Sequence, residues 1–464
     1  MPEIRLDDTI AALATPVGES GLAVIRISGK EAFKIIGKVF RSPKGRPEDF
    51  ASHTLHLGRI EGRDGTLIDQ AMIALFRGPG SYTGEDTVEL SCHGGLVVVR
   101  SVLDRVIQAG ARHAEAGEFT KRAFLNGRLD LTQAEAVSDL IRAKSRKAAE
   151  AAALQLSGQG LSAKLKNLKE RMLKMYAHME AFLDFPDEHL EVYSDQEFAR
   201  GFSGLRGEMT ALLEGFQRGA LLREGLTVAL AGKPNVGKSS LFNALLARDR
   251  ALVSEFAGTT RDVIEEALEI RGFCVRLLDT AGLSGNLSHP LERMGMERAK
   301  TALAAADLTL FLVDASAPPD TEDAEAFKAV DLEKPVAVIL HKIDLGDKIS
   351  GEQTKQFGGN PEMLKVSSKT GAGLEGIEAW IEKKILSAKI EATQAQLTRL
   401  RHKNGVEQAL AAVQRAEKGF FQKQSLEFVV LEMKEALDAL RELVGEVYSE
   451  DLLDVVFSEF CIGK

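Results

Sequence analysis

The spacing of hydrophobic and polar residues changes along this chain. Up to about residue 118, short runs of branched apolar residues alternate with glycine-rich turns, as at 22–27 and 71–76. One longer run, 96–109, carries apolar residues at helical spacing. Short apolar runs bounded by turns are typical of strands, and the longer run is typical of a helix. We therefore expect a compact α+β domain over residues 1–118.

From residue 119 to 219 the sequence favours helices, because apolar residues recur at helical spacing, such as the leucine or methionine at 161, 165, 168 and 172. Between 220 and 385, strand-like and helical segments alternate, which is typical of a doubly wound, mainly parallel sheet. The strand-like runs there are 226–231, 275–279, 308–314 and 336–341. The pattern of residues 386–464 again favours helices. The predicted architecture is a multidomain α/β and α protein whose 220–385 domain is inserted into a discontinuous helical domain.

Composition indicates the number of domains and the cellular compartment, but it says little about the chemistry of the protein. A length of 464 residues predicts two to four domains, and 59 basic against 68 acidic residues give a net charge of −9. The three cysteines, Cys92, Cys274 and Cys461, are scattered and odd in number, which favours a reducing compartment. With no signal peptide and no membrane-length apolar run, we expect a cytoplasmic protein without a membrane partner. The locally basic segment 383–423 is either a solvated helix face or a site for RNA phosphate.

The segment 232–239, Gly-Lys-Pro-Asn-Val-Gly-Lys-Ser, matches the GxxxxGK[ST] pattern of a P-loop. It follows the strand-like run 226–231 and precedes a helical run, which is the context that the pattern requires. Backbone N–H groups of such a loop cradle phosphate oxygens. Lys238 is expected to reach the β and γ phosphates, and the Ser239 hydroxyl to bind Mg²⁺.

Four further motifs favour GTP over ATP. Asp279 closes a strand where a carboxylate can hold magnesium-bound water, and the Gly282 amide can sense the γ phosphate. Thr260 is placed to complete magnesium coordination. Asp344 can accept two hydrogen bonds from guanine, whereas adenine offers no such pair of donors. Ser367, Ser368 and Lys369 would support the base from its far side. The predicted GTP-binding residues are Asn235, Val236, Gly237, Lys238, Ser239, Ser240, Ser254, Thr259, Thr260, Asp279, Thr280, Ala281, Gly282, Lys342, Asp344, Ser367, Ser368 and Lys369.

Two positions depart from the usual GTPase pattern. His341 stands where the guanine motif normally has asparagine, which puts the bracing role of that asparagine in doubt. Leu283 stands where Ras-like enzymes carry the glutamine that orients water. A potassium ion at the phosphates is one substitute, held by Asn235 with carbonyl groups between Ser254 and Thr259, including that of Phe256. The other is Glu292 as a water-positioning residue, although the sequence alone favours a surface carboxylate at a helix start for this residue.

With these motifs in order, the chain resembles the MnmE (TrmE) family of tRNA-modification GTPases over essentially its whole length. The resemblance also rests on segments outside the GTPase motifs. These are 14–16, 25–29, 81–86, 93–95, 117–119, 122–127, 184–188 and the terminal Phe-Cys-Ile-Gly-Lys at 460–464.

The resemblance implies a homodimer formed through an N-terminal, folate-binding-like domain that takes a tetrahydrofolate derivative, either 5-formyl- or methylene-tetrahydrofolate. Residues matched by position to the folate site are Arg26, Glu89, Arg128 and Lys464, with Arg128 where the family usually has lysine. An FAD-dependent partner, MnmG, completes a heterotetramer that installs aminomethyl-type groups on carbon 5 of the wobble uridine of certain tRNAs. Potassium-dependent pairing of the GTPase domains is also implied, and it strengthens the roles of Asn235 and Glu292.

Cys461 is the remaining candidate. A cysteine near a chain end is usually exposed and incidental, but Lys464 stands beside it and a neighbouring cation favours a reactive thiol. The resemblance brings this tail to the folate site, so a catalytic role is expected. The rival function is a GTP-switched ribosome- or assembly-associated factor without modification chemistry. A stand-alone folate-dependent methyltransferase leaves the inserted GTPase domain unexplained.

Overall fold

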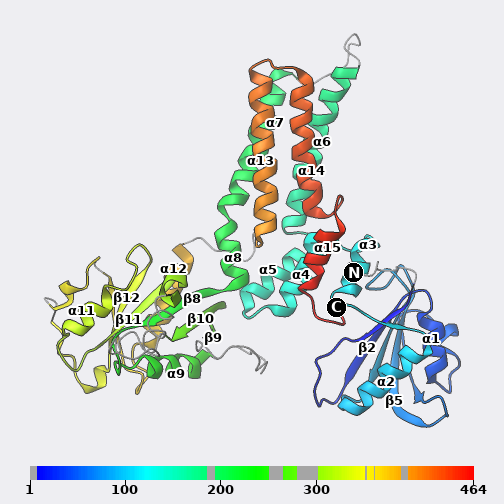
Figure 1. Ribbon diagram of the computed structural model, residues 1–464, viewed down its shortest axis with the longest axis horizontal. Coiled ribbons are helices and arrows are strands. Elements are labelled where there is room, and N and C mark those ends of the chain that lie inside the picture. Colours follow the sequence, from blue (N-terminus) through cyan, green and yellow to red (C-terminus); the bar gives the residue numbers. More distant parts are fainter. Residues whose placement is uncertain are drawn as a thin grey trace. The chain divides into compact units, whose positions relative to one another are not determined.

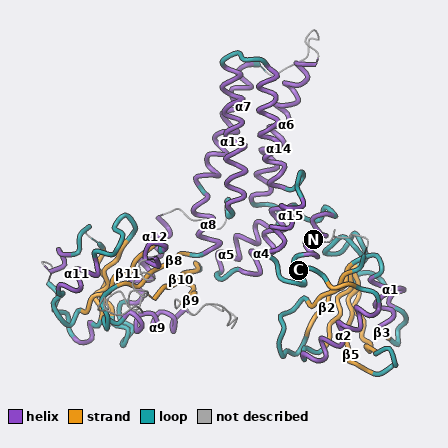
Figure 2. The backbone as a smooth tube through the Cα atoms, viewed as in Figure 1, coloured by secondary structure: helices purple, strands orange, loops and turns teal. Residues whose placement is uncertain are grey.

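The structure is a computed structural model that describes residues 8–184, 194–249, 265–279, 301–350, 353–359, 361–387 and 396–464. It divides into two compact units. The first contains Met1–Ser138, Ser162–Ala177 and Met433–Lys464, and the second contains Asp139–Leu161 and His178–Glu432. The elements of each are shown in Figures 1 and 2.

The first unit is built on a seven-stranded sheet of order β3-β4-β5-β6-β2-β1-β7. Neighbouring strands are antiparallel except for the parallel pair β1 and β7. The strands are β1 (Ile10–Leu13), β2 (Ala23–Ser28), β3 (Phe40–Arg41), β4 (Thr54–Glu61), β5 (Leu67–Phe76), β6 (Thr87–Cys92) and β7 (Arg112–His113). Helices α1 (Ala32–Val39) and α2 (Leu96–Ala109) pack on the sheet.

Strand β5 shows why only one face of this sheet carries the core. Ala71, Ile73 and Leu75 are buried against α1 and α2, whereas Met72 between them is exposed. Successive side chains of a strand point to opposite faces, so this alternation places the apolar core on the helix-covered side.

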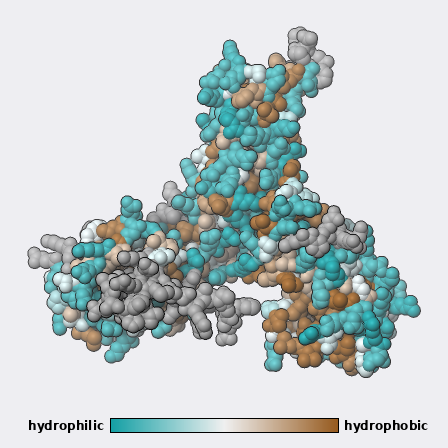
Figure 3. Space-filling model, in the orientation of Figure 1, coloured by the Kyte–Doolittle hydropathy of each residue, from teal (hydrophilic) through white to brown (hydrophobic). Residues whose placement is uncertain are grey.

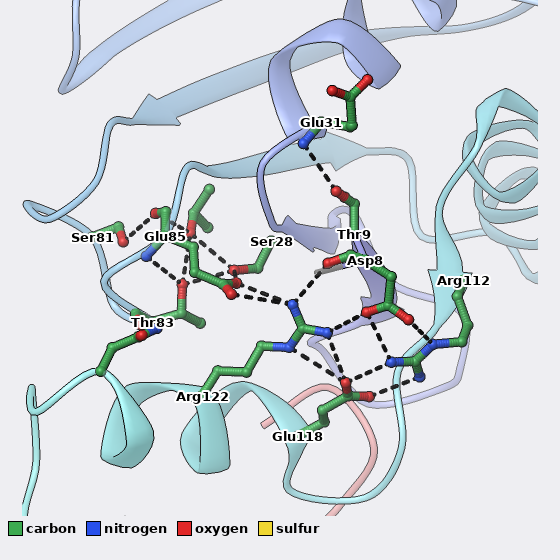
Figure 4. A network of polar contacts seen from close by, with 12 residues as sticks. Asp8, Thr9, Ser28, Glu31, Ser81, Thr83, Glu85, Arg112, Glu118 and Arg122 are labelled. Atoms are coloured by element: carbon green, nitrogen blue, oxygen red, sulfur yellow. Dashed lines mark hydrogen bonds and ion pairs between the residues drawn. The ribbon is translucent and has the colours of Figure 1, made fainter. Parts of the chain in front are cut away.

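Buried charges join the sheet to the following helix, α3 (Glu118–Leu125) (Figure 4). The fully buried guanidinium of Arg122 donates to Asp8 Oδ1 at 2.7 Å and to Glu118 Oε1 at 2.9 Å. Arg112 on β7 donates to the same two carboxylates, each at 2.7 Å, and Glu85 lies on the other side of Arg122. Although burial raises the pKa of Glu118, the hydrogen bond from Arg112 and the proximity of Arg122 bring it below its ordinary value. Pairing of this kind is what buried charges require.

The first unit contains further helices that follow α3 in the chain. Helix α15 (Glu450–Ser458) contacts α3, and Lys121 bonds Asp454 at 2.9 Å. Helices α4 (Leu131–Arg142), α6 (Leu161–Asp184) and α14 (Leu426–Val444) each lie partly in this unit. The four apolar residues expected on one helical face, Leu161, Leu165, Leu168 and Met172, are all fully buried on α6, as the spacing predicts.

The second unit contains a six-stranded sheet of order β13-β12-β11-β8-β10-β9. All neighbours are parallel except β9, which pairs antiparallel with β10 at the edge. The strands are β8 (Leu226–Ala231), β9 (Glu265–Ile270), β10 (Phe273–Asp279), β11 (Leu308–Asp314), β12 (Val336–His341) and β13 (Glu362–Val366). The helices beside the sheet are α9 (Lys238–Asp249), α11 (Thr321–Phe327) and α12 (Leu374–Ser387).

Two separate cores line the two faces of this sheet. Val228 and Leu230 of β8 pack with residues of α9 and α12, whereas Ala229 and Ala231 belong to the core that contains Phe327 of α11. A strand that is buried on both faces is the mark of a doubly wound sheet, so the predicted fold of this region is confirmed.

Among the described residues, the second unit also contains α5 (Arg146–Leu156), α7 (Asp195–Glu214), α8 (Phe216–Glu224) and α13 (Leu400–Phe421). Helix α7 begins with a capping box between Ser194 and Glu197. It packs against α13, where the ring centres of Phe202 and Phe420 lie 5.9 Å apart. Short 3₁₀ segments are η1 (Pro47–Asp49), η2 (Ile343–Leu345) and η3 (Gln353–Gln356). Within the described ranges, every helix is too short or too polar to cross a bilayer.

Candidate functional site

The P-loop occupies the turn between β8 and α9 with the backbone bends that its glycines predict. Gly232 has φ +137°, and a Cβ there would lie 2.5 Å from the carbonyl oxygen of Leu312. Asn235 has φ +59° and Gly237 φ +105°, conformations that turn the loop around the N-terminus of α9. An α-helix N-terminus presents unpaired N–H groups and a positive dipole end, so this turn is suited to bind an anion.

Lys238 lies inside that turn. Its Nζ donates to the carbonyl oxygens of Gly232 at 2.8 Å and Lys233 at 2.9 Å. Burial lowers the pKa of Lys238, and the Asp279 carboxylate acts in the opposite direction. The ammonium is thus held within the loop in the position that phosphate oxygens require.

A carboxylate at the end of β10 completes a cation position. The Ser239 hydroxyl donates to Asp279 Oδ2 at 3.0 Å. Asp279 Oδ1 is buried and has no hydrogen-bond partner among the described residues. A buried carboxylate oxygen without a partner is costly. A hydroxyl and a carboxylate side by side are oxygen ligands of the kind that Mg²⁺ prefers, and the residues present therefore fit this ion.

The predicted base-binding residues meet beyond the ends of β12 and β13. Ser367, fully buried, donates from Oγ to Asp344 Oδ1 at 2.6 Å. This hydrogen bond, together with Lys369 nearby, lowers the pKa of Asp344, which is exposed. Asp344 is therefore a fixed, ionised acceptor open to a ligand with paired N–H donors.

His341, the last residue of β12, and Lys342, which follows it, connect these base-binding residues to the P-loop. Lys342 donates from Nζ to the Asn235 carbonyl oxygen at 3.0 Å and to Asp314 Oδ2 at 2.7 Å. Burial raises the pKa of Asp314, but Lys342 and Ser316 lower it to about 2. His341 bonds to the P-loop through Nδ1 and the carbonyl oxygen of Val236, at 2.9 Å. Sequence reasoning predicted neither of the two contacts with the P-loop, because both end on backbone oxygens that any residue carries.

A second cluster lies on the first unit, where Arg26 of β2 stands opposite Glu89 of β6. The Arg26 guanidinium donates twice to Glu89 Oε1, at 2.8 and 3.0 Å. It also lies 5.2 Å from the ring centre of Tyr82 and 5.7 Å from that of Phe119. The aromatic neighbours were not assigned to a site from the sequence, although they fall in segments that carried the resemblance.

The C-terminal tail docks beside this pair. Ile462 forms a β-bridge with Ala116, and the Phe119 N–H donates to the Lys464 carbonyl oxygen at 3.2 Å. Gly463 has φ +98° and approaches the Leu13 carbonyl so closely that a Cβ would collide with it. Burial, and then the Arg26 guanidinium, lower the pKa of Lys464, while Glu89 and Cys461 act in the opposite direction. Cys461 itself is exposed.

The structure thus brings together Arg26, Glu89, Lys464 and Cys461. Arg128 is different: it is exposed, its stem lies near Gly84, and no hydrogen bond or ion pair among the described residues joins it to the other three. Several predicted residues lie outside the described residues. These are Ser254, Phe256, Thr259, Thr260, Thr280, Ala281, Gly282, Leu283 and Glu292.

Comparison with known proteins identifies the family. A family model described as the MnmE helical domain matches residues 131–461, and one described as the GTP-binding protein TrmE N-terminus matches residues 9–128. The tRNA modification GTPase MnmE of Symbiobacterium thermophilum is 43% identical over 99% of this chain and 100% of its own length. The chain belongs to the MnmE family. The MnmE of Moorella thermoacetica is likewise 43% identical, over 99% of this chain and its own full length.

Membership of the MnmE family confirms the predicted family, the multidomain α/β and α fold class, and the enzyme class, a GTPase of tRNA modification. Among solved structures, the G domain of the T. maritima FeoB iron transporter is 29% identical, with a TM-score of 0.26, and the match covers 35% of this chain and 98% of that one. The domain boundaries and the roles of individual residues remain predictions.

Proposed function

We propose that this chain is a potassium-stimulated GTP hydrolase whose cycle serves the modification of carbon 5 of the wobble uridine in tRNA, together with an FAD-dependent partner. One observation carries the proposal. A cation position at Ser239 and Asp279 and a base-recognition position at Asp344 and Ser367 occur in one parallel-sheet domain, in a chain that matches the MnmE family over its whole length.

GTP is the nucleotide that this arrangement favours. The ionised Asp344 offers acceptors to the N1–H and exocyclic amine of guanine, and adenine lacks this donor pair. The P-loop amides and Lys238 would hold the phosphates, with Ser239 and Thr260 on Mg²⁺. When bound, the metal neutralises charge that develops on the phosphates.

Potassium supplies what Leu283 cannot, because a leucine side chain makes no hydrogen bond to the attacking water. We assign the ion to Asn235, which is exposed at the bend of the P-loop, and to Ser254, Phe256 and Thr259. Glu292 would position the water. A monovalent cation at the phosphates stabilises charge in the transition state, as an arginine finger does elsewhere.

The test is GTP hydrolysis by the full chain in KCl and in NaCl at equal ionic strength. Stimulation by K⁺ of at least about 10-fold is expected, with GDP affinity the same in both salts, and Asn235→Ala should remove the stimulation. Equal rates of the unaltered protein in both salts would refute the potassium assignment. No hydrolysis in either salt, from a folded protein, would contradict the GTPase itself.

A tetrahydrofolate derivative, 5-formyl- or methylene-tetrahydrofolate, is the ligand that we assign to the Arg26–Glu89 cluster. A carboxylate can accept from the N–H groups of the folate ring, and the cations Arg26, Lys464 and Arg128 suit folate carboxylates. The aromatic rings beside Arg26 fit a flat ligand. Such a ligand supplies the one-carbon unit, and the exposed thiol of Cys461 is available to act on it.

The proposed assembly is a homodimer through the N-terminal domain, joined by MnmG in a heterotetramer that acts on tRNA in the cytoplasm. An apolar area on the first unit supports the dimer (Figure 3). Leu55 and Leu57 of β4 and Met72 of β5 are exposed, and Leu57 lies directly opposite Met72. Exposed apolar side chains that lie next to one another on a sheet are suited to pair with a second copy. A single-chain mass by light scattering would refute the dimer.

A further inference from the structure

The side chain of Lys233, the second residue of the P-loop, is held by two carboxylates outside the loop. Its Nζ donates to Asp320 Oδ2 at 2.7 Å and to Asp323 Oδ2 at 2.8 Å. Asp320 is the N-cap of α11 and Asp323 lies in its first turn, where the two carboxylates and backbone N–H groups form a capping box. The P-loop is therefore joined by a side chain to the start of α11.

This ion pair has a deeply buried partner. Asp323 is 1% exposed, and its Oδ1 has no hydrogen-bond partner among the described residues. Although burial lowers the pKa of Lys233, its hydrogen bonds to Asp320 and Asp323 raise it above the ordinary value, and the same contact lowers the pKa of Asp320. Removing the partner of a buried carboxylate is costly, so the Lys233 side chain is firmly held.

The backbone of Lys233 in turn positions Lys238. The Lys238 ammonium donates to the carbonyl oxygens of Gly232 and Lys233, at 2.8 and 2.9 Å. These carbonyl groups belong to the peptide bonds on either side of Lys233. An ammonium has three N–H donors, so two are taken by the loop and the third is left for a phosphate oxygen. A shift of Lys233 would turn both carbonyl groups and so redirect that donor.

We propose that Lys233 is a positioning residue of the phosphate site: its ion pairs with Asp320 and Asp323 fix the two carbonyl groups that aim the Lys238 ammonium at the β and γ phosphates. This inference rests on the proposed binding of a guanine nucleotide. The effect should be confined to nucleotides with a β phosphate, because these are the phosphates that a P-loop lysine reaches. Base recognition at Asp344 depends on other loops and should be unaffected.

The first test compares GDP with GMP, which lacks the β phosphate, in competition against a labelled guanine nucleotide on the full chain with Mg²⁺. Lys233→Met keeps the side-chain stem but removes the charge, and should weaken GDP binding about 10-fold while GMP affinity stays within about twofold. Lys233→Arg keeps the charge and the donors, and its GDP affinity should stay within about threefold of the unaltered protein. Thermal unfolding shows that each variant is folded. Equal losses of GDP and GMP affinity in Lys233→Met would overturn the inference.

The second test uses Asp320→Asn, which removes one charged partner of Lys233 but keeps a side chain suited to the N-cap of α11. It also serves if Lys233→Met does not fold. It should weaken GDP binding by about threefold and change nothing further in the Lys233→Met background, because both act through one ion pair. Lys365→Met is the matched control, since it breaks an ion pair of similar length, 2.7 Å to Asp347, on β13. Additive losses in the double variant, or the same loss in Lys365→Met, would contradict the inference.

The outcome distinguishes this inference from the proposed function. If the unaltered chain binds no GDP, the proposed function fails and this inference fails with it. If the unaltered chain and Lys233→Met bind GDP equally well, guanine-nucleotide binding stands and the positioning role of Lys233 is refuted.

Discussion

The proposed guanine acceptor, Asp344, is held in place by a neighbouring side chain. Its carboxylate is exposed, yet Ser367 holds Oδ1 at 2.6 Å and lowers its pKa. A charge that is fixed in this way loses little freedom when it meets the two N–H groups of guanine.

Asp344→Asn tests this role. The amide replaces one acceptor with a donor, so it should weaken GDP binding by at least about 10-fold and improve binding of xanthosine diphosphate, whose ring has an acceptor at that position. Competition against a labelled nucleotide measures both affinities. Asp347→Asn is the matched control, because this neighbouring carboxylate pairs with Lys365 outside the site. Equal losses in the two variants would contradict specific base recognition.

How far the site could be predicted differs from residue to residue. Lys238, Ser239 and Asp344 were assigned from motifs, because side-chain chemistry at a fixed spacing defines their roles. The substitution of histidine at 341 was noticed, but its contacts were not, since they depend on where the Val236 carbonyl points. The same holds for the ion pairs of Lys233 with Asp320 and Asp323, which no spacing rule connects.

Among the elements, the buried parallel strands were the easiest to predict. The expected runs 226–231, 308–314 and 336–341 coincide with β8, β11 and β12, because strands buried on both faces read as unbroken apolar runs. The edge strand β9 (Glu-Glu-Ala-Leu-Glu-Ile) was not predicted. Its glutamates interrupt the apolar run by which a strand is recognised, and charged residues are common on edge strands.

The proposed folate binding depends on the position of the C-terminal tail. Gly463→Ala should displace it, because a Cβ at φ +98° collides with the Leu13 carbonyl. We expect binding of 5-formyl-tetrahydrofolate to weaken by about 5-fold or more while GDP affinity stays unchanged, both measured by calorimetry. Gly65→Ala is the control: its φ is +80°, but its Cβ would meet nothing within 4 Å. Folate binding that is unchanged in Gly463→Ala would contradict a role of the tail in the proposed folate site.

At the scale of the whole molecule, the first unit holds the Arg26–Glu89 cluster and the tail, and the second holds the P-loop and the base-recognition residues. The chain thus carries two chemically different clusters of candidate ligand-binding residues. A GTP switch without modification chemistry has no use for the first, whereas a folate-dependent enzyme without a switch has no use for the second. Their coexistence favours nucleotide hydrolysis that serves a one-carbon transfer.

The most direct measurement is nucleoside analysis of tRNA from cells that lack this chain. The account predicts loss of the carbon-5 modification of the wobble uridine, full restoration by the unaltered chain, and no restoration by Lys238→Ala or by Cys461→Ser, provided that both variants accumulate as folded protein. Wobble uridines that stay modified in the absence of the chain would contradict the account and favour a GTP-switched assembly factor instead.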